Sequence, residues 1–330
     1  MKLPDIQLDM FGKPVPLENG QPVRKAPKPS TAVGSPTALD HEAMAKALEA
    51  SGLYRISRKL LAPTVAENPR PGFPRNGLLV DTETTGLSHR TDEVIEIGAV
   101  AFSFNEAGQI GDVTGVYGGL RKPDRPVPAE ITRLTGITDK MLEGQEIDYL
   151  ALDRLVGPAD LVIAHNAAFD RPFCERLTDT FGQKAWACSV KEVDWKGRGF
   201  EGTKLGYLIG QSGYFHDGHR AVDDCFALLE VLARPTGPQL TTAFSELLAA
   251  SQRSRVRIWA ENSPFDMKEK LKARGYRWSD GSDGKPKSWW TEVDENVVTD
   301  EMGFLRSEIY GRADIEPLTN HLTAAVRYKA

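Results

Sequence analysis

The feature that most constrains the fold is the stretch GLLVDTETT (residues 77–85), an apolar run that ends in two carboxylates. Such a run predicts a buried strand. Asp81 and Glu83 are two residues apart, so a strand places both side chains on one face. Adjacent carboxylates repel one another unless a cation or a proton offsets their charge. The stretch therefore predicts a strand end with an oxygen-ligand site for a hard divalent cation such as Mg²⁺ or Mn²⁺.

Residues 77–234 alternate between strand patterns and helix patterns. EVIEIGAVAFSFN (93–105) alternates like a strand with one covered face. One alternative for Glu96 is that it reaches the metal site from this neighbouring strand, but we expect it to point outward. DLVIAHNAAFD (160–170) predicts a buried strand that leads into a helix, and HRAVDDCFALLEVLA (219–233) predicts an amphipathic helix. These patterns predict an α/β domain with a mixed sheet flanked by helices.

Three further segments flank this domain. Residues 1–37 are rich in Pro, Gly, Lys and Ser and predict a disordered tail. Residues 38–76 predict two short helices followed by a Pro-rich linker. Residues 250–330 predict a small α+β module that is basic and rich in tryptophan. Lys and Arg outnumber Asp and Glu there by ten to five across residues 253–287, although the whole chain has a net charge of −5.

Composition also bounds the environment of the protein. Its three cysteines are too few and too scattered for a disulfide framework, and they lack the paired spacing of a zinc site. No apolar run is long enough for a membrane span or a signal peptide. We therefore expect a cytoplasmic protein that makes no contact with a membrane.

Three sequence blocks together resemble the motifs of the DEDD exonucleases. They are DTETTGL (81–87), HNAAFD (165–170) and HRAVDD (219–224). Their order is similar to that of the subclass with a catalytic histidine, typified by the proofreading epsilon subunit of bacterial DNA polymerase III. The resemblance covers roughly residues 77–234 and implies a ribonuclease-H-like exonuclease fold.

The resemblance also implies roles for individual residues. Helical spacing alone leaves Asp223 or Asp224 to face the metals, and the family pattern selects Asp224. His219 matches the general base. The implied ligands of two Mg²⁺ or Mn²⁺ ions are Asp81, Glu83, Asp170 and Asp224. The implied contacts to the terminal nucleotide are Thr84, Leu87, Thr135 and Gly136, the last two in the segment ITRLTGITDKML.

The same residues suggest a reaction. Two cations can activate a water on one side of a phosphodiester and stabilise the leaving oxygen on the other, while the His219 imidazole accepts the proton of the water. We expect a 3′–5′ exonuclease that releases mononucleotides from DNA 3′ ends in replication proofreading or repair. One alternative is an exonuclease that trims RNA. Another is a non-catalytic nucleic-acid-binding scaffold, although a scaffold has no need for all five residues.

The two ends of the chain suggest partners. The segment FDMKEKLKARGYRWSDGSDGKPKSWW (265–290) predicts a basic helix, a strand, a Gly-rich turn and an aromatic strand. Basic and aromatic side chains suit single-stranded DNA, although a small module also needs tryptophans for its own core.

QLDMF (7–11) resembles peptides that bind the replication sliding clamp, with Gln7, Leu8, Met10 and Phe11 as the contacts. A DNA polymerase is a further candidate partner.

Overall fold

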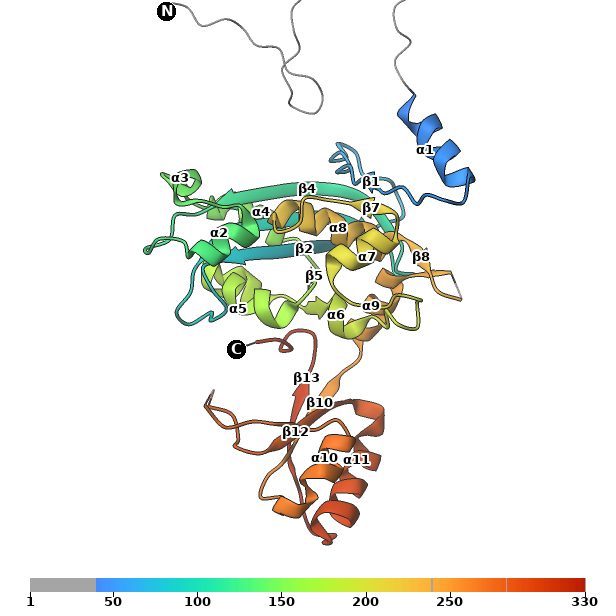
Figure 1. Ribbon diagram of the computed structural model, residues 1–330. Coiled ribbons are helices and arrows are strands. Elements are labelled where there is room, and N and C mark those ends of the chain that lie inside the picture. Colours follow the sequence, from blue (N-terminus) through green and yellow to red (C-terminus); the bar gives the residue numbers. More distant parts are fainter. Residues whose placement is uncertain (1–39, 239, 283, 330) are drawn as a thin grey trace, which may run out of the picture. The chain divides into compact units, whose positions relative to one another are not determined.

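The computed structural model describes residues 40–238, 240–282 and 284–329 (Figure 1). The chain forms two units, Met1–Arg55 and Ile56–Ala330. The predicted tail and the clamp-like peptide at residues 7–11 lie outside the described residues. Among the helices that the structure describes, none is long and apolar enough to cross a membrane.

The first unit contains helix α1 (His41–Ala50), which begins where the Asp40 carboxylate accepts a hydrogen bond from the Ala43 amide. The prediction of a second helix before residue 76 is wrong. Within residues 51–74 the structure instead has the short strand β1 (Arg58–Lys59), which pairs in parallel with β7 (Tyr214–Phe215). Leu60 and β1 both belong to the second unit, and the apolar side chain of Leu60 packs against the core of that unit from an extended segment.

A five-stranded mixed sheet forms the centre of the second unit, with strand order β4-β3-β2-β5-β6. Strands β2, β3 and β4 are antiparallel neighbours, whereas β5 and β6 continue the sheet in parallel with β2. The strands are β2 (Arg75–Thr84), β3 (Val94–Phe104), β4 (Ile110–Leu120), β5 (Leu161–Ala164) and β6 (Trp186–Cys188). The predicted mixed sheet of an α/β domain is confirmed.

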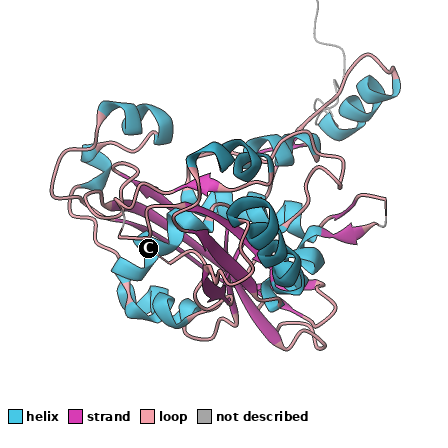
Figure 2. Ribbon diagram, turned by 90° about the horizontal axis from the view of Figure 1, so that it is seen from below, coloured by secondary structure: helices cyan, strands magenta, loops and turns pink. Residues whose placement is uncertain are grey.

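Helices flank this sheet and form a core on each face (Figure 2). Val100 and Phe102 of β3 belong to one core, and Ile97 and Ala99 belong to the other. Every residue of β3 is buried, so the expectation of one covered face was wrong for this strand. The first core includes α7 (Leu205–Gln211), α8 (Ala221–Ala233) and α9 (Ala243–Gln252). The second includes α4 (Tyr149–Val156) and α5 (Ala167–Leu177).

Shorter elements connect these layers. Helix α2 ends at Gly136, which adopts a left-handed φ of 72°, a conformation that glycine takes without steric cost. The remaining elements of the α/β domain are α2 (Ala129–Thr135), α3 (Asp139–Leu142), η1 (Asp179–Gln183), α6 (Ser189–Glu192), β8 (Pro235–Thr236) and β9 (Thr241–Thr242).

The C-terminal module is a four-stranded antiparallel sheet of order β11-β12-β10-β13 with helices packed against it. Its own core includes Ile258, Leu271 and Leu305. The predicted basic helix, strand, turn and aromatic strand correspond to α10, β11, the following turn and β12. Its elements are β10 (Arg255–Ala260), η2 (Phe265–Met267), α10 (Lys268–Ala273), β11 (Arg277–Trp278), β12 (Trp289–Asp294), η3 (Glu295–Val297), α11 (Val298–Phe304), η4 (Leu305–Tyr310) and β13 (Leu318–Leu322).

Residues 323–328, which we call the C-terminal strap, follow β13 and bind the α/β domain. Arg171 of α5 is fully buried, and its guanidinium donates to the backbone carbonyls of Ala325 at 2.7 Å and Arg327 at 2.6 Å. Arg327 is itself buried and donates to Glu192 of α6 at 2.8 Å. Two buried arginines therefore join the strap to the helices that follow β5 and β6.

Candidate active site

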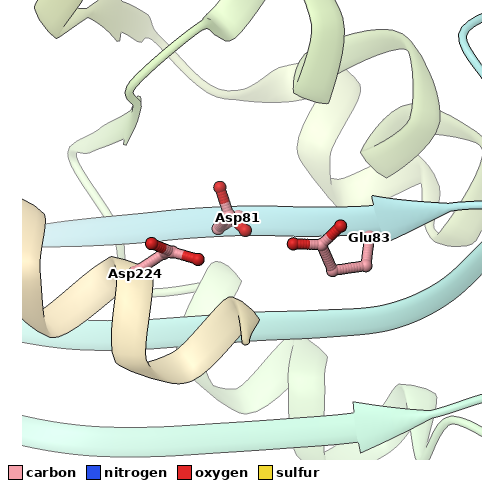
Figure 3. Close-up of side chains that lie close together, drawn as sticks. All are labelled: Asp81, Glu83 and Asp224. Atoms are coloured by element: carbon pink, nitrogen blue, oxygen red, sulfur yellow. The ribbon is translucent and has the colours of Figure 1, made fainter. Parts of the chain in front are cut away.

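Three carboxylates from two elements meet on one face of the sheet. Leu79 of β2 belongs to the core that α8 covers. Because alternate residues of a strand point to the same face of the sheet, Asp81 and Glu83 lie on the same side as Leu79 and α8. Asp224 comes from the first turn of α8. One carboxylate oxygen from each residue lies within 4.8 Å of the others, and the side chains turn toward one another (Figure 3). We call Asp81, Glu83 and Asp224 the carboxylate cluster.

The close approach of α8 to the sheet depends on a glycine. Gly98 of β3 is paired with Asp81 across the ladder. A Cβ atom at Gly98 would lie 2.3 Å from the backbone carbonyl carbon of Ala221, the first residue of α8. Because glycine carries no side chain, α8 begins directly over β3 and brings Asp224 to Asp81.

Asp170 lies beside the cluster but is not part of it. It comes from α5 and is only 3% exposed. One of its carboxylate oxygens accepts hydrogen bonds from the Thr82 amide at 3.1 Å and the Thr82 hydroxyl at 2.8 Å. Its charge still reaches Asp81, whose pKa it helps to raise. Thr82 therefore fixes Asp170 against the strand that carries the cluster, a role that sequence reasoning missed.

Burial disfavours the charged form of Asp81, Glu83 and Asp170, and repulsion from neighbouring carboxylates adds to this effect at Asp81 and Glu83. Burial raises the pKa of Asp81 well above its usual value, and the charges of Asp170 and Asp224 add to the effect. Burial, followed by the charge of Asp224, raises the pKa of Glu83 to about 8. Burial also raises the pKa of Asp170 to about 7. The carboxylate oxygens of these residues have too few positive groups near them to balance their negative charge. Oxygen ligands of this kind fit hard divalent cations such as Mg²⁺ or Mn²⁺.

Glu96 is placed differently from the expectation. It is 5% exposed, so the prediction that it points outward is wrong. The Arg220 guanidinium donates to its carboxylate at 2.9 Å, and the Ala221 amide donates to it at 3.2 Å. Glu96 is the cross-strand partner of Glu83, and its charge helps to raise the pKa of Asp81 and of Glu83. The structure is therefore nearer to the alternative that Glu96 approaches the site from the neighbouring strand. Glu96 in turn holds the first turn of α8 against β3.

Two histidines lie near the cluster. The Nδ1 atom of His219 is 3.9 Å from a Glu83 carboxylate oxygen, and its side chain is 53% exposed. Its φ of 63° is in the left-handed region, which non-glycine residues adopt at an energetic cost. His216 lies closer, with Nε2 at 2.7 Å from Asp224 Oδ1. Sequence reasoning missed His216, because no motif marks it beyond its place in HDGH (216–219).

The residues predicted to contact a terminal nucleotide fall into two kinds. Leu87 is 86% exposed in the loop after β2 and presents an apolar side chain to solvent. Thr84 and Thr135 are both buried, and their hydroxyls donate to nearby backbone carbonyls. Gly136 supplies the left-handed turn after α2. Their predicted contacts with a nucleotide remain predictions.

Comparison with known proteins gives consistent matches over the α/β domain. A family model described as "Exonuclease" matches residues 78–232. The DNA polymerase III subunit epsilon of Treponema pallidum is 31% identical over 169 residues, which cover 46% of this chain and 72% of that protein. The DNA polymerase III PolC-type of Thermotoga petrophila is 30% identical over 174 residues, which cover 48% of this chain but only 12% of that protein.

A search of solved structures matches Escherichia coli exonuclease I in complex with a dA16 oligonucleotide. The TM-score is 0.45 and the sequence identity is 13%, and the match covers 66% of this chain and 63% of that one.

Proposed function

Because the chain belongs to the exonuclease family that includes the epsilon subunit of DNA polymerase III, we propose that it is a metal-dependent 3′–5′ exonuclease that releases mononucleotides from DNA 3′ ends. The observation that carries this proposal is the carboxylate cluster, whose oxygens from β2 and α8 lie within 4.8 Å of one another. Such a cluster is costly in a protein that does not use it to bind cations.

Each residue near the cluster has a role in this proposal. Asp81, Glu83, Asp224 and the neighbouring Asp170 hold two Mg²⁺ or Mn²⁺ ions, which when bound activate a water and stabilise the leaving oxygen. His219 accepts the proton of the attacking water on an imidazole nitrogen.

Two other groups prepare the site. The hydrogen-bonding distance between His216 and Asp224 lets the imidazole orient that carboxylate. In the loop after β2, the exposed Leu87 packs against the base of the terminal nucleotide. Thr84, Thr135 and Gly136 lie beside the same nucleotide and contact it in this proposal.

The proposal also covers the cellular process, the protein partners and the location of the protein. The match to a polymerase III subunit supports a role in replication proofreading or repair, in company with a DNA polymerase. The sliding clamp is a further proposed partner, through Gln7, Leu8, Met10 and Phe11. The three cysteines are free thiols, which supports a cytoplasmic setting.

The test uses the purified full-length protein with 5′-labelled single-stranded DNA and RNA of the same sequence. We expect Mg²⁺-dependent shortening of the DNA from its 3′ end, one nucleotide at a time, and complete inhibition by EDTA. A 3′-terminal phosphorothioate should slow the reaction. Faster degradation of the RNA would overturn the choice of DNA. Shortening that persists in EDTA would overturn the metal mechanism.

A further inference from the structure

A cleft of about 310 Å³ lies between the α/β domain and the C-terminal module. This volume is at the lower end of the range for ligand pockets, roughly 300–1,000 Å³. We call it the cationic cleft. Its basic lining residues are Arg90, Lys191, Arg257, Lys285, Arg327 and Lys329.

The charged side chains that line the cleft are mostly basic. Its one acidic lining residue among the described residues is Glu292, which the Arg257 guanidinium already binds at 2.6 Å. Arg90, Lys191 and Lys329 have no carboxylate within ion-pair distance anywhere in the described ranges, and all three are exposed. Their positive charge stays unneutralised on a concave surface of a chain whose net charge is −5. A concave cationic surface of this kind concentrates polyanions.

The wall of the cleft also contains an aromatic ring. Trp290 is half-buried, and the Arg257 guanidinium lies 4.8 Å from the centre of its ring. Trp259, whose ring centre is 5.9 Å from that of Trp290, is only 1% exposed and so packs beneath the lining. Cationic groups beside a half-buried aromatic ring suit a strand with phosphates and bases.

Helix α5 separates this cleft from the active site. Ala168 and Pro172 line the cleft and are four residues apart, so they share one face of the helix. Asp170 lies midway between them in sequence and therefore faces the opposite side. A strand that occupied both sites would have to pass around this helix.

The loop between β2 and β3 supplies a path around α5. Its Leu87, four residues after Glu83 in the sequence, is exposed, and its Arg90 lines the cleft. Arg176 of α5 donates to the backbone carbonyls of His89 and Asp92, the latter at 2.9 Å, and so fixes the loop on the helix. A strand with its 3′ end at the cluster can therefore follow this loop into the cleft.

We propose that the cationic cleft binds the phosphate backbone of single-stranded DNA upstream of the 3′ end that enters the active site. The choice of DNA as the polyanion rests on the proposed function. We therefore expect a trinucleotide to occupy the active site alone, and a strand of about 15 nucleotides, within the range of known single-strand sites, to occupy both.

The test measures DNA binding without cleavage. Full-length protein carrying Asp81→Asn is mixed with 5′-fluorescent oligonucleotides in EDTA, and binding is followed by anisotropy at several salt concentrations. In this background the variant Arg90→Ala/Lys191→Ala/Lys329→Ala should weaken binding of the longer strand about ten-fold, and each lost cation should lower the salt slope by about 1. Binding of the trinucleotide should not change.

The matched control removes a cation of the same module that lies outside both the cleft and residues 265–290. Arg312 pairs with Asp314 at 2.7 Å, so Arg312→Ala should leave both affinities unchanged. A melting temperature for each variant shows whether it is folded. Deletion of the module is unsuitable, because it would also remove the C-terminal strap.

Each outcome separates this inference from the proposed function. Unchanged affinity of the triple variant for the longer strand would overturn the cleft as a DNA site, and so would an equal loss for the trinucleotide. Tighter binding of an acidic peptide than of DNA at the cleft would overturn the choice of ligand. If the unmodified enzyme fails to shorten DNA but the triple variant still loses affinity, the proposed function fails and the cleft stands.

Discussion

The carboxylate cluster and the C-terminal module treat buried acids in opposite ways. In the module, Glu301 is 7% exposed, but it accepts hydrogen bonds from the Arg274 guanidinium and the Tyr276 hydroxyl, both at 2.9 Å. In the cluster, Asp81 and Glu83 have mainly other carboxylates as neighbours, and their pKa values are raised. Side chains of the module itself supply the hydrogen bonds of Glu301, whereas the carboxylate cluster requires a cation or a proton from outside the protein. The first arrangement serves stability and the second serves chemistry.

The sharpest test of this contrast replaces one acid in each region. Asp81→Asn should lower kcat by about 10³-fold or more, because a bound metal ion supplies several kcal/mol of transition-state stabilisation. Glu301→Gln should leave kcat unchanged. The melting temperatures of the metal-free variants should move in opposite directions, since Asp81→Asn removes a repulsion and Glu301→Gln breaks a satisfied pair. If both variants lose stability alike, the contrast fails.

The second test separates the two histidines beside the cluster. His219→Gln should lower kcat by about 10²- to 10⁴-fold, the usual contribution of a general base. His216→Gln should raise the metal concentration needed for half-maximal rate, with a smaller loss of kcat at saturating metal, because His216 orients Asp224. Rates measured across a metal titration distinguish these outcomes. The reverse result would assign the base to His216.

The third test applies one substitution in both regions. Gly98→Ala places a Cβ 2.3 Å from the Ala221 backbone, so it should push α8 away and cost about 1–3 kcal/mol of stability as well as activity. Gly303 lies in α11 of the module, where an added methyl group would meet nothing within 4 Å, so Gly303→Ala should stabilise by about 0.5–1 kcal/mol. Chemical denaturation measures both. If both substitutions change the free energy of unfolding in the same direction, Gly98 does not determine how closely α8 approaches the sheet.

The fourth test concerns pH. The pKa of Glu83 is raised from 4.5 to about 8 in the folded protein, so between these values the folded state holds more protons than the unfolded state. The stability of the metal-free protein should therefore fall as pH rises through this window. Added Mg²⁺ should restore it, with a larger gain at high pH than at low pH. A Mg²⁺ gain that is independent of pH would contradict this prediction.

Much of the site could be predicted from the sequence because its signals are local. The spacing of Asp81 and Glu83 places both on one face of a strand, and the motif order identified the family and the fold, which are confirmed. The choice of Asp224 over Asp223 came from the family pattern, and the structure brings Asp224 into the cluster.

The rest depends on contacts between distant parts of the chain. We expected Glu96 to face solvent because its own strand alternates, and only Arg220, 124 residues away, reveals that it is buried. The hydrogen-bonding distance between His216 and Asp224 requires the turn before α8, which no periodicity marks. Strand β3 is covered on both faces because α4 and α8 fold back onto it. The alternation of polar and apolar residues within one strand carries no information about helices that come later in the chain and cover its faces.

The C-terminal strap has a consequence for how the protein is made. Arg171 donates to carbonyls that lie 153 to 156 residues further along the chain. While the ribosome is still synthesising the module, this arginine keeps its ion pair with Glu175 at 2.7 Å but has none of those carbonyl acceptors. A buried donor without an acceptor costs free energy, so the helix that carries Asp170 gains its full stability only after the strap has emerged. The last residues of the module therefore complete the packing of a helix that lies beside the carboxylate cluster.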